Sequence, residues 1–536
     1  MIWTILLIVQ GILILFILVS KRSRSEKEPP LDKGVIPWLG HALEFGRDAS
    51  KFLTRMKVKH GDIFTVRVAG RYVTVLLDPS SYDAVIEDSV SLDFTRYAQV
   101  LMDRIFSLRL PHHNPAVEKA MMKQHFEGES LSCLSSTMHC HLQSLLLQAQ
   151  RPCHNQTDWN TDGLFSFCYS LLFRVFFTRG DRCRAVKMFW DVRGALHSSP
   201  SSHSSLSIIL DLHLHGILFL RAGYLTHFEG EQKSNRTDPI AVYAEYRKFD
   251  NLLTKMARTM LKPEEKRTAH SVRVRLWDLL APAGLGEGSG SSTWLRCYRH
   301  LLQEEGADEE TQRRALLLQL WATQGNVGPA AFWLLGFLLT NPEAMRAVKK
   351  EFSKISGQDS AQCPLLDRLQ HTPVFDSALE ETLRLSAAPF ITREVVQAKT
   401  LHMADGQEYK LRSGDRVCLF PFISPQMDPE IHQEPQRFKY DRFLNQEGSV
   451  KKDFFKGGRR LKYYTMPWGA GTNGCVGKRF AISSIRQFVY LVLSHLELEL
   501  CDPEAQMPEV NSSRYGFGML QPEGDLAIRY KPRRSH

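Results

Sequence analysis

The chain has 536 residues, of which 43% are hydrophobic and 24% charged, a balance that is typical of a globular protein and excludes a disordered one. The formal net charge is +10, but no basic run alternates with aromatic residues, so we expect no nucleic-acid partner. A positive surplus of this size favours contact with an acidic membrane surface instead.

The first predicted element is a single membrane-spanning helix at residues 1–20. Residues 2–19 are uncharged and apolar except for Thr4 and Gln10, and a helix of this length nearly spans the hydrocarbon core of a bilayer. The basic residues 21–24 follow directly, so the positive-inside rule places the rest of the chain in the cytosol. A cleaved signal peptide is the alternative, although no basic residue precedes the apolar run and no small-residue cleavage site follows it.

The next segments predict a linker and then a β-hairpin. Residues 21–46 are basic and rich in proline and glycine, which indicates an extended linker that leads into a globular domain. Residues 61–79 alternate β-branched and polar side chains around Gly70, which predicts two antiparallel strands. Most of the remaining chain has helical periodicity, so the predicted fold is mainly α with a small β region near the N-terminus.

The ten cysteines are scattered along the chain and form no C-x-x-C pair. This pattern argues against a disulfide framework in so long a chain. It favours a reducing compartment, in agreement with the predicted cytosolic domain.

The longest helical pattern covers residues 308–345. It is polar at its start, almost wholly apolar in the middle, and ends at an Asn-Pro pair. Such a segment is too apolar for a surface helix and predicts a buried central helix, whose hydrogen-bond ladder Gly325, Gly328 and Pro329 should loosen. A second membrane span is the alternative, but polar residues interrupt the apolar part.

Two charged motifs follow the central helix. Glu381 and Arg384 stand three residues apart, so they share one face of a predicted helix, although such pairs are common and contribute little on a solvated surface. Arg442 follows in a polar loop that precedes a glycine-rich stretch. The Glu381–Arg384 pair is informative only together with Arg442 and the glycine-rich stretch that follows it.

The glycine-rich stretch at residues 466–480 contains one cysteine that is followed by a helical pattern. Its glycines free the backbone to loop closely beneath a flat ligand, and a helix N-terminus favours a thiolate at the cysteine. A structural zinc would require several nearby Cys or His residues, and a buried free cysteine in a glycine loop is the remaining alternative. The key positions are Trp468, Gly469, Gly471, Cys475 and Gly477.

In this order near the C-terminus, the three motifs resemble the cytochrome P-450 superfamily of haem-thiolate proteins. The resemblance implies a cytochrome P-450 fold, with a single haem domain over residues 47–536 and haem as the cofactor. It implies that Cys475 is the axial iron ligand, which donates electron density to the iron, and that Trp468 and the neighbouring glycines surround the haem. It also implies that Glu381 and the two arginines form a buried ion triad, which should not tolerate the loss of one member.

Several further blocks, from residue 29 to the C-terminus, resemble one branch of this superfamily, an endoperoxide isomerase of the endoplasmic reticulum membrane. That branch converts the lipid endoperoxide prostaglandin H2 into prostacyclin and requires neither dioxygen, NADPH nor a reductase. A sterol hydroxylase of the same superfamily, which needs oxygen and a reductase, is one alternative. An inactive haem-binding or membrane scaffold protein is another.

The chain departs from the superfamily pattern at the predicted site. Val327 and Gly328 replace the acid-threonine pair that delivers protons to bound dioxygen, which suits an endoperoxide isomerase, although sterol hydroxylases with a similar stretch still use oxygen. Asn473 replaces a frequent arginine two residues before the cysteine, so haem propionates need other cations, and Lys123 is a candidate that could equally be a plain surface lysine. Asn326 is expected to donate a hydrogen bond to a substrate oxygen, or alternatively to satisfy a loosened turn of the helix.

The predicted substrate pocket is built around the central helix and residues 389–392. Simple core packing is the alternative for its aromatic and proline members. The candidates are Trp321, Asn326, Pro389, Phe390 and Thr392.

Residues 175–220 have no clear relation to either flank when the chain is set beside this family. They contain basic clusters, a Ser/His-rich tract and an apolar tail. We expect them to be an atypical insertion, either retained non-coding sequence in a gene model or an unusual isoform, which would interrupt a helix over the substrate chamber.

Overall fold

The computed structural model describes residues 3–4, 10–11, 25–149, 159–170, 239–281, 293–356 and 365–533. The predicted insertion at 175–220 and most of the predicted anchor lie outside these residues. Within the ranges that are described, no helix combines the length and the apolar composition needed to cross a bilayer.

The β-structure is concentrated in one six-stranded sheet with the order β1-β2-β3-β9-β6-β4. Its strands are β1 (Leu31–Asp32), β2 (Ile63–Val68), β3 (Arg71–Leu76), β4 (Leu92–Asp93), β6 (Ile391–Val395) and β9 (Arg416–Leu419). The smaller sheets contain β5 (Asn160–Gly163), β12 (Leu496–Leu500) and β13 (Ala527–Pro532), β7 (Lys399–His402) with β8 (Glu408–Leu411), and β10 (Phe455–Lys456) with β11 (Arg459–Arg460).

The predicted hairpin at residues 61–79 is confirmed. β2 and β3 pair antiparallel across a two-residue turn, in which Ala69 and Gly70 both have positive φ, 47° and 79°. This left-handed turn matches the twist of the flanking strands. β3 then pairs parallel with β9, so the sheet joins the N-terminal segment to a strand more than 300 residues later. β1, within the predicted linker, adds to the same sheet beside β2.

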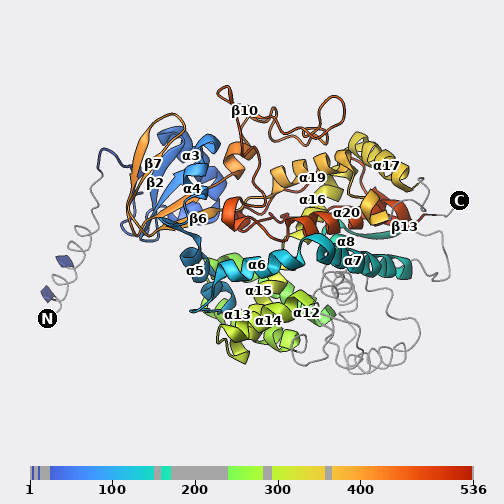
Figure 1. Ribbon diagram of the computed structural model, residues 1–536, viewed down its shortest axis with the longest axis horizontal. Coiled ribbons are helices and arrows are strands. Elements are labelled where there is room, and N and C mark those ends of the chain that lie inside the picture. Colours follow the sequence, from blue (N-terminus) through green and yellow to red (C-terminus); the bar gives the residue numbers. More distant parts are fainter. Residues whose placement is uncertain are drawn as a thin grey trace.

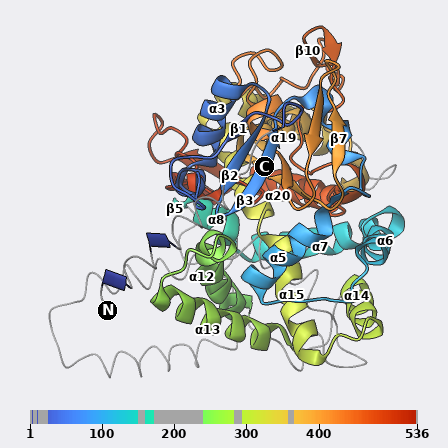
Figure 2. The ribbon, with the colours of Figure 1, turned by 90° about the vertical axis from the view of Figure 1, so that its left-hand side faces the viewer.

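Helices make up most of the described structure, as expected for a mainly α fold. In Figures 1 and 2 the six-stranded sheet lies on one side of the molecule and α12 to α14 lie on the other. The helices are α2 (Ala42–Arg47), α3 (Ala49–His60), α4 (Asp83–Ile86), α5 (Phe94–Phe106), α6 (Pro115–His125), α7 (Gly128–Ala149), α8 (Leu164–Ser170), α12 (Pro239–Ala257), α13 (Pro263–Leu280), α14 (Thr293–Glu304), α15 (Glu309–Gln324), α16 (Val327–Thr340), α17 (Pro342–Ser356), α18 (Leu365–Arg368), α19 (Pro373–Ser386) and α20 (Lys478–His495). Short helical turns are η1 (Pro79–Ser81), η4 (Phe422–Gln426), η5 (Gly471–Asn473) and η6 (Ser512–Arg514).

The predicted central helix is present but divided into α15 and α16. The division falls at Gly325 and Asn326, where the sequence predicted a loosened ladder. A Cβ atom on Gly325 would lie 2.8 Å from both the Trp321 carbonyl oxygen and the Tyr246 hydroxyl, so a side chain would not fit there without movement. α16 is buried on nearly every side and ends at Thr340, just before the Asn-Pro pair.

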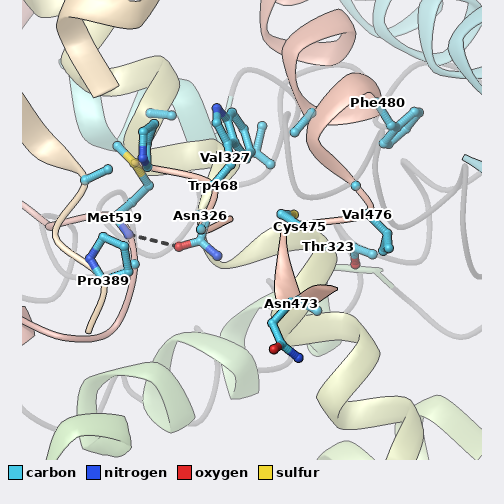
Figure 3. A pocket seen from close by; sticks show the side chains of 18 of the residues that line it. Thr323, Asn326, Val327, Pro389, Trp468, Asn473, Cys475, Val476, Phe480 and Met519 are labelled. Atoms are coloured by element: carbon cyan, nitrogen blue, oxygen red, sulfur yellow. Dashed lines mark hydrogen bonds between the residues drawn. The ribbon is translucent and has the colours of Figure 1, made fainter. Parts of the chain in front are cut away.

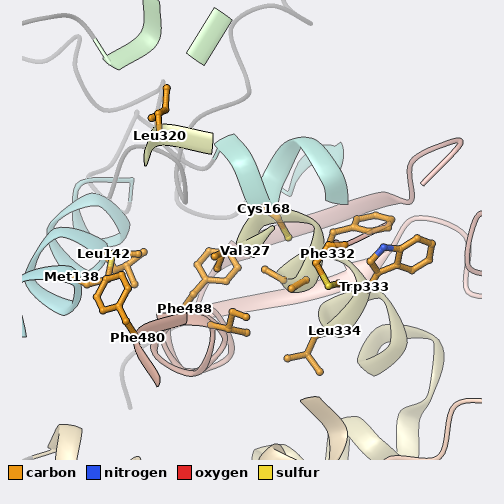
Figure 4. Packing of buried hydrophobic residues seen from close by; sticks show 14 of the residues in the cluster. Met138, Leu142, Cys168, Leu320, Val327, Phe332, Trp333, Leu334, Phe480 and Phe488 are labelled. Carbon is orange, nitrogen blue, oxygen red and sulfur yellow. The ribbon is translucent and has the colours of Figure 1, made fainter. Parts of the chain in front are cut away.

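The largest hydrophobic cluster holds α16 against α20. Figure 4 shows part of this cluster, with Phe332 and Trp333 contributed by α16 and Phe488 by α20. The buried Trp333 indole donates a hydrogen bond to the carbonyl oxygen of Leu520, 2.8 Å away, so its polar atom is satisfied. This packing fixes the central helix relative to the glycine-rich stretch, which leads directly into α20.

Candidate functional site

A tight backbone loop presents Cys475 just before the N-terminus of α20. The Cys475 amide donates to the Trp468 carbonyl oxygen at 2.9 Å, which closes the loop. Gly469 and Gly471 have positive φ of 66° and 62°, a conformation that favours glycine. A Cβ atom on Gly471 would also lie 2.6 Å from Cγ2 of Ile86, so this position allows no side chain without a shift.

Cys475 lines the pocket drawn in Figure 3, and in this structure it is exposed. Burial outweighs the backbone amides of Gly477 and Lys478 and the charges of Lys478 and Lys119, which lower the pKa of Cys475, so this pKa lies above its ordinary value. These donors surround the sulfur where a helix begins, so they stabilise a thiolate once a cation binds it, and a coordinating metal deprotonates a thiol outright.

The thiol opens into a cavity of about 370 Å³. Its walls come from the break between α15 and α16, the cysteine loop with the start of α20, and the segments that carry Pro389 and Met519, and α5, α6, α14 and α19 add further side chains. Most lining side chains are apolar, and Arg393 is the single charged residue among the described residues that line it. No described carboxylate reaches this space, and Val327, one of the two residues that replace the acid-threonine pair, forms part of the wall.

The structure brings Glu381, Arg384 and Arg442 together behind the cysteine loop. Glu381 Oε2 accepts hydrogen bonds from Arg384 Nε at 2.7 Å and from Arg442 Nε at 2.8 Å. Its other oxygen accepts from Arg384 Nη2 at 2.9 Å and from the Lys439 amide at 3.1 Å. Glu381 and Arg384 are fully buried. Four hydrogen bonds from protein donors therefore replace the water that would bind the Glu381 carboxylate on the surface.

The triad connects directly to the chain that enters the cysteine loop. Arg384 Nη1 donates to the Gln426 carbonyl oxygen at 2.6 Å. The Gln426 side chain then accepts from the Met466 amide at 3.4 Å, two residues before Trp468. The ion cluster therefore braces the backbone that carries the cysteine.

Asn326 lies at the break between α15 and α16 and lines the cavity. Its Oδ1 atom accepts a hydrogen bond from the Met519 amide at 3.0 Å, marked by the dashed line in Figure 3. Because Oδ1 is held in this way, Nδ2 is the amide atom left to donate to a ligand. The side chain therefore satisfies a backbone group of a distant segment, and it forms no cap hydrogen bond to the loosened turn of its own helix, which was the alternative stated from sequence. It also contributes a donor to the cavity wall.

The remaining predicted pocket residues lie in different places. Pro389 and Phe390 line the cavity. Trp321 does not line it, and its ring packs 5.8 Å from that of Phe106. Thr392 is also outside the lining and contacts the sulfur of Cys418 at 3.6 Å.

The cations near the site differ from the one that the sequence suggested. Lys123 is exposed, with Nζ 4.0 Å from a carboxylate oxygen of Glu127, and does not line the cavity. Lys119, one helical turn earlier, donates to the Thr472 carbonyl oxygen in the cysteine loop. Arg393 lines the cavity and was not predicted, although its position directly after the predicted pocket residues 389–392 is a signal that could have identified it.

The site fits a haem group on three observations. Cys475 offers one soft ligand with a helix N-terminus behind it. The Nε1 atom of Trp468 and the Nη2 atom of Arg393 are buried donors that find no partner among the described residues, and both side chains border the cavity. Haem propionates would satisfy such donors, and the apolar walls suit a porphyrin.

A mainly helical fold with one cysteine beneath such a cavity defines a haem-thiolate protein, and comparison with known proteins agrees. The family model described as Cytochrome P450 matches residues 297–528. This chain belongs to the cytochrome P450 family, and haem is its cofactor.

The similar proteins cover nearly the whole chain. It is 49% identical to the prostacyclin synthase of Rattus norvegicus, over 95% of each chain. It is 38% identical to the 7-alpha-hydroxycholest-4-en-3-one 12-alpha-hydroxylase of Homo sapiens, over 95% of this chain and 94% of that one. The solved structure of retinoic acid bound cyanobacterial CYP120A1 matches with a TM-score of 0.64 at 15% identity, covering 95% of this chain and 100% of that one, which supports the fold alone.

Proposed function

We propose that this protein is a prostaglandin-I synthase, an isomerase that converts prostaglandin H2 into prostacyclin without dioxygen or NADPH. The observation that carries the proposal is the similarity to prostacyclin synthase, 49% over 95% of the chain, compared with 38% to a sterol hydroxylase over the same share. The cavity, which no described carboxylate lines, is compatible with a reaction that requires no proton delivery to dioxygen.

The proposed reaction is a balanced rearrangement. The O–O bond of the endoperoxide breaks, one oxygen bonds to the neighbouring double bond, and the proton lost from carbon is balanced by one gained at the other oxygen. No external electron donor is consumed. When bound, haem supplies an iron centre with a thiolate ligand, which favours O–O cleavage.

The residues of the chain orient the substrate and keep the site dry. Asn326 Nδ2 is placed to donate a hydrogen bond to an oxygen of the substrate, because its Oδ1 is already bound by Met519. The walls formed by Val327, Pro389 and Phe390 exclude water and pack against the hydrocarbon chains of the lipid. Cys475 holds the cofactor beneath them.

We also propose that the protein is a single-pass protein of the endoplasmic reticulum membrane with its catalytic domain in the cytosol. The uncharged run at residues 2–19 and the basic residues after it support this orientation. The described N-terminal segment exposes large apolar side chains, Val35 and Val58 by 97% and 84%, with Trp38 half exposed, which suits contact with lipid. Alkaline extraction of cell membranes tests the anchor, since a spanning protein stays in the pellet.

The decisive experiment mixes the purified haem protein with prostaglandin H2, anaerobically and without NADPH. We expect the bicyclic enol ether and its hydrolysis product, identified by mass spectrometry. The Cys475→Ser variant, run in parallel, measures spontaneous decay of the endoperoxide. Hydroxylation of a sterol that depends on oxygen, NADPH and reductase, with no anaerobic product, would instead assign the protein to the hydroxylases. Haem binding without any turnover would favour the scaffold alternative.

A further inference from the structure

A buried acid on α12 holds the C-terminal loop that contacts Asn326. Arg514 donates from Nη1 to Asp250 Oδ1 at 2.9 Å and from Nη2 to Asp250 Oδ2 at 2.7 Å. Gln521 Nε2 donates to the same Oδ2 at 2.7 Å, and Gln521 Oε1 accepts from Arg514 Nη2 at 3.1 Å. All three side chains are buried. Asp250 therefore binds both ends of the segment at residues 514–521, which we call the C-terminal loop.

The Asp250 cluster is ionised and nearly complete in its hydrogen bonds. Burial raises the pKa of Asp250, but Arg514 and Arg247 outweigh this effect, so the pKa lies below its ordinary value. Arg247 adds a fourth side-chain contact, with Nη1 3.1 Å from Oδ2. A buried network that satisfies its members restricts them to one arrangement. None of these residues lines the cavity, so the cluster does not touch a ligand there.

Between its two fixed ends, the C-terminal loop runs along the cavity wall. The Gly516 amide donates to the Ala388 carbonyl oxygen at 2.8 Å, and the Ala388 amide donates to the Gly518 carbonyl oxygen at 2.8 Å. Gly518 has a φ of 90°, and a Cβ atom there would lie 2.5 Å from Asn326 Oδ1. The backbone therefore approaches Asn326 closely enough for the Met519 amide to bind it at 3.0 Å.

We propose that Asp250 is a positioning residue, which holds the C-terminal loop so that the Met519 amide orients Asn326 with Nδ2 toward the substrate. The cluster acts on the reaction through Asn326 and not by contact. The role in catalysis rests on the proposed function, whereas the effect on the orientation of Asn326 does not.

Hydrogen exchange of the haem protein tests the orientation step without any turnover. In Asp250→Asn we expect the Met519 amide to exchange about 10-fold faster or more, because the C-terminal loop that carries this amide is no longer held against Asn326. Gln521→Met keeps the Asp250–Arg514 ion pair and should give a smaller increase in the exchange rate of the Met519 amide. This variant replaces Asp250→Asn in the test if Asp250→Asn does not fold. Asp376→Asn breaks a different acid–arginine pair, with Arg486 on α20, and should leave exchange at Met519 unchanged. Unchanged exchange at Met519 in the folded Asp250 or Gln521 variant would overturn the proposal.

A double-mutant cycle tests the catalytic step. We expect Asn326→Ala to lower kcat with prostaglandin H2 by about 10- to 100-fold, and Gln521→Met to lower kcat less, with little change in KM. The variant with both changes should be no slower than Asn326→Ala alone, because the two residues act through one group. Losses that multiply in the double variant would mean that the cluster acts independently of Asn326, which overturns the proposed route. If the parent protein does not convert prostaglandin H2, the proposed function fails, and the exchange experiment still decides whether Asp250 positions Asn326.

Discussion

Arg384 binds Glu381 through two hydrogen bonds of 2.7 and 2.9 Å in a region where neither side chain is exposed. Arg442 adds a third charged contact to the same carboxylate. Each charge has lost its water and depends on the others for compensation. The cluster is therefore sensitive to the loss of any one member.

Removal of the carboxylate charge should destabilise the whole haem domain. In Glu381→Gln two buried guanidinium groups lose their counterion, and we expect the free energy of unfolding to fall by about 3–5 kcal/mol. Urea unfolding of the haem protein, followed by the Soret absorbance, measures the loss. Glu434→Gln, which breaks exposed pairs with Arg437 and Lys439, is the matched control and should unfold as the parent does. Equal stability of the two variants would contradict the role of the triad.

Replacement of the thiol should abolish thiolate ligation without unfolding the protein. We expect Cys475→Ser to lose the carbonyl-complex absorbance band typical of a thiolate-bound haem iron. Turnover should fall by more than about 100-fold, since changes in the outer shell of a metal site already reach that size. Far-ultraviolet circular dichroism should remain that of the parent. Cys501→Ser changes an exposed cysteine outside the cavity and should leave both spectrum and rate intact. A parent-like spectrum in Cys475→Ser would exclude this residue as the ligand.

Haem retention should depend on Arg393 and not on Lys123. Arg393 Nη2 is buried beside the cavity without a described partner, whereas Lys123 is exposed and does not line the cavity. Transfer of haem to an excess of apomyoglobin measures the dissociation rate. We expect Arg393→Leu to lose haem about 10- to 100-fold faster than the parent, and Lys123→Met to match the parent. Faster loss from the Lys123 variant alone would restore the assignment made from sequence.

The stability of the fold should depend on pH through His113. Burial lowers the pKa of His113, but contacts of 2.6 Å with Glu118 and 2.7 Å with Glu305 outweigh it and raise the pKa from 6.5 to about 9. Because the pKa in the folded state is raised, the charged contact stabilises the fold fully below pH 6.5 and is lost as the pH rises through about 9.

Unfolding experiments between pH 6 and pH 9.5 test this assignment. The difference in the free energy of unfolding between the parent and His113→Gln should be largest at pH 6 and should shrink toward pH 9.5. His402→Gln, which removes an exposed histidine paired with Glu408, is measured in parallel as the control. A difference that is constant with pH would show that His113 does not titrate with folding.

Local spacing in the sequence predicted those features that depend on neighbouring residues. Gly70, in the left-handed hairpin turn with Ala69, and Gly325, at the division of the central helix, mark these two places because glycine widens the conformations open to its own backbone. The segment at residues 42–47 was predicted as part of an extended linker but forms α2. Packing against α3 and β2 stabilises a helix there, although the proline and glycine residues of this segment predicted an extended conformation.

Contacts between distant segments could not be predicted in the same way. Lys119 and Lys123 share one face of α6, and only the position of the cysteine loop decides that Lys119 reaches it. Asp250 and Arg514 are 264 residues apart, and no local pattern relates them.

The sequence alone predicted the ligand and determined the class of cofactor and the position of the helix break, because a thiol within glycines and a glycine within a helix act through the backbone beside them. Tertiary structure decided which donors surround that ligand and what holds them. Arg393 became a buried donor, and Asn326 acquired a fixed orientation, only when strands and loops from far along the chain closed around α16. Burial removes water from these groups, and the partners that replace it are set by packing in three dimensions and not by spacing along the chain.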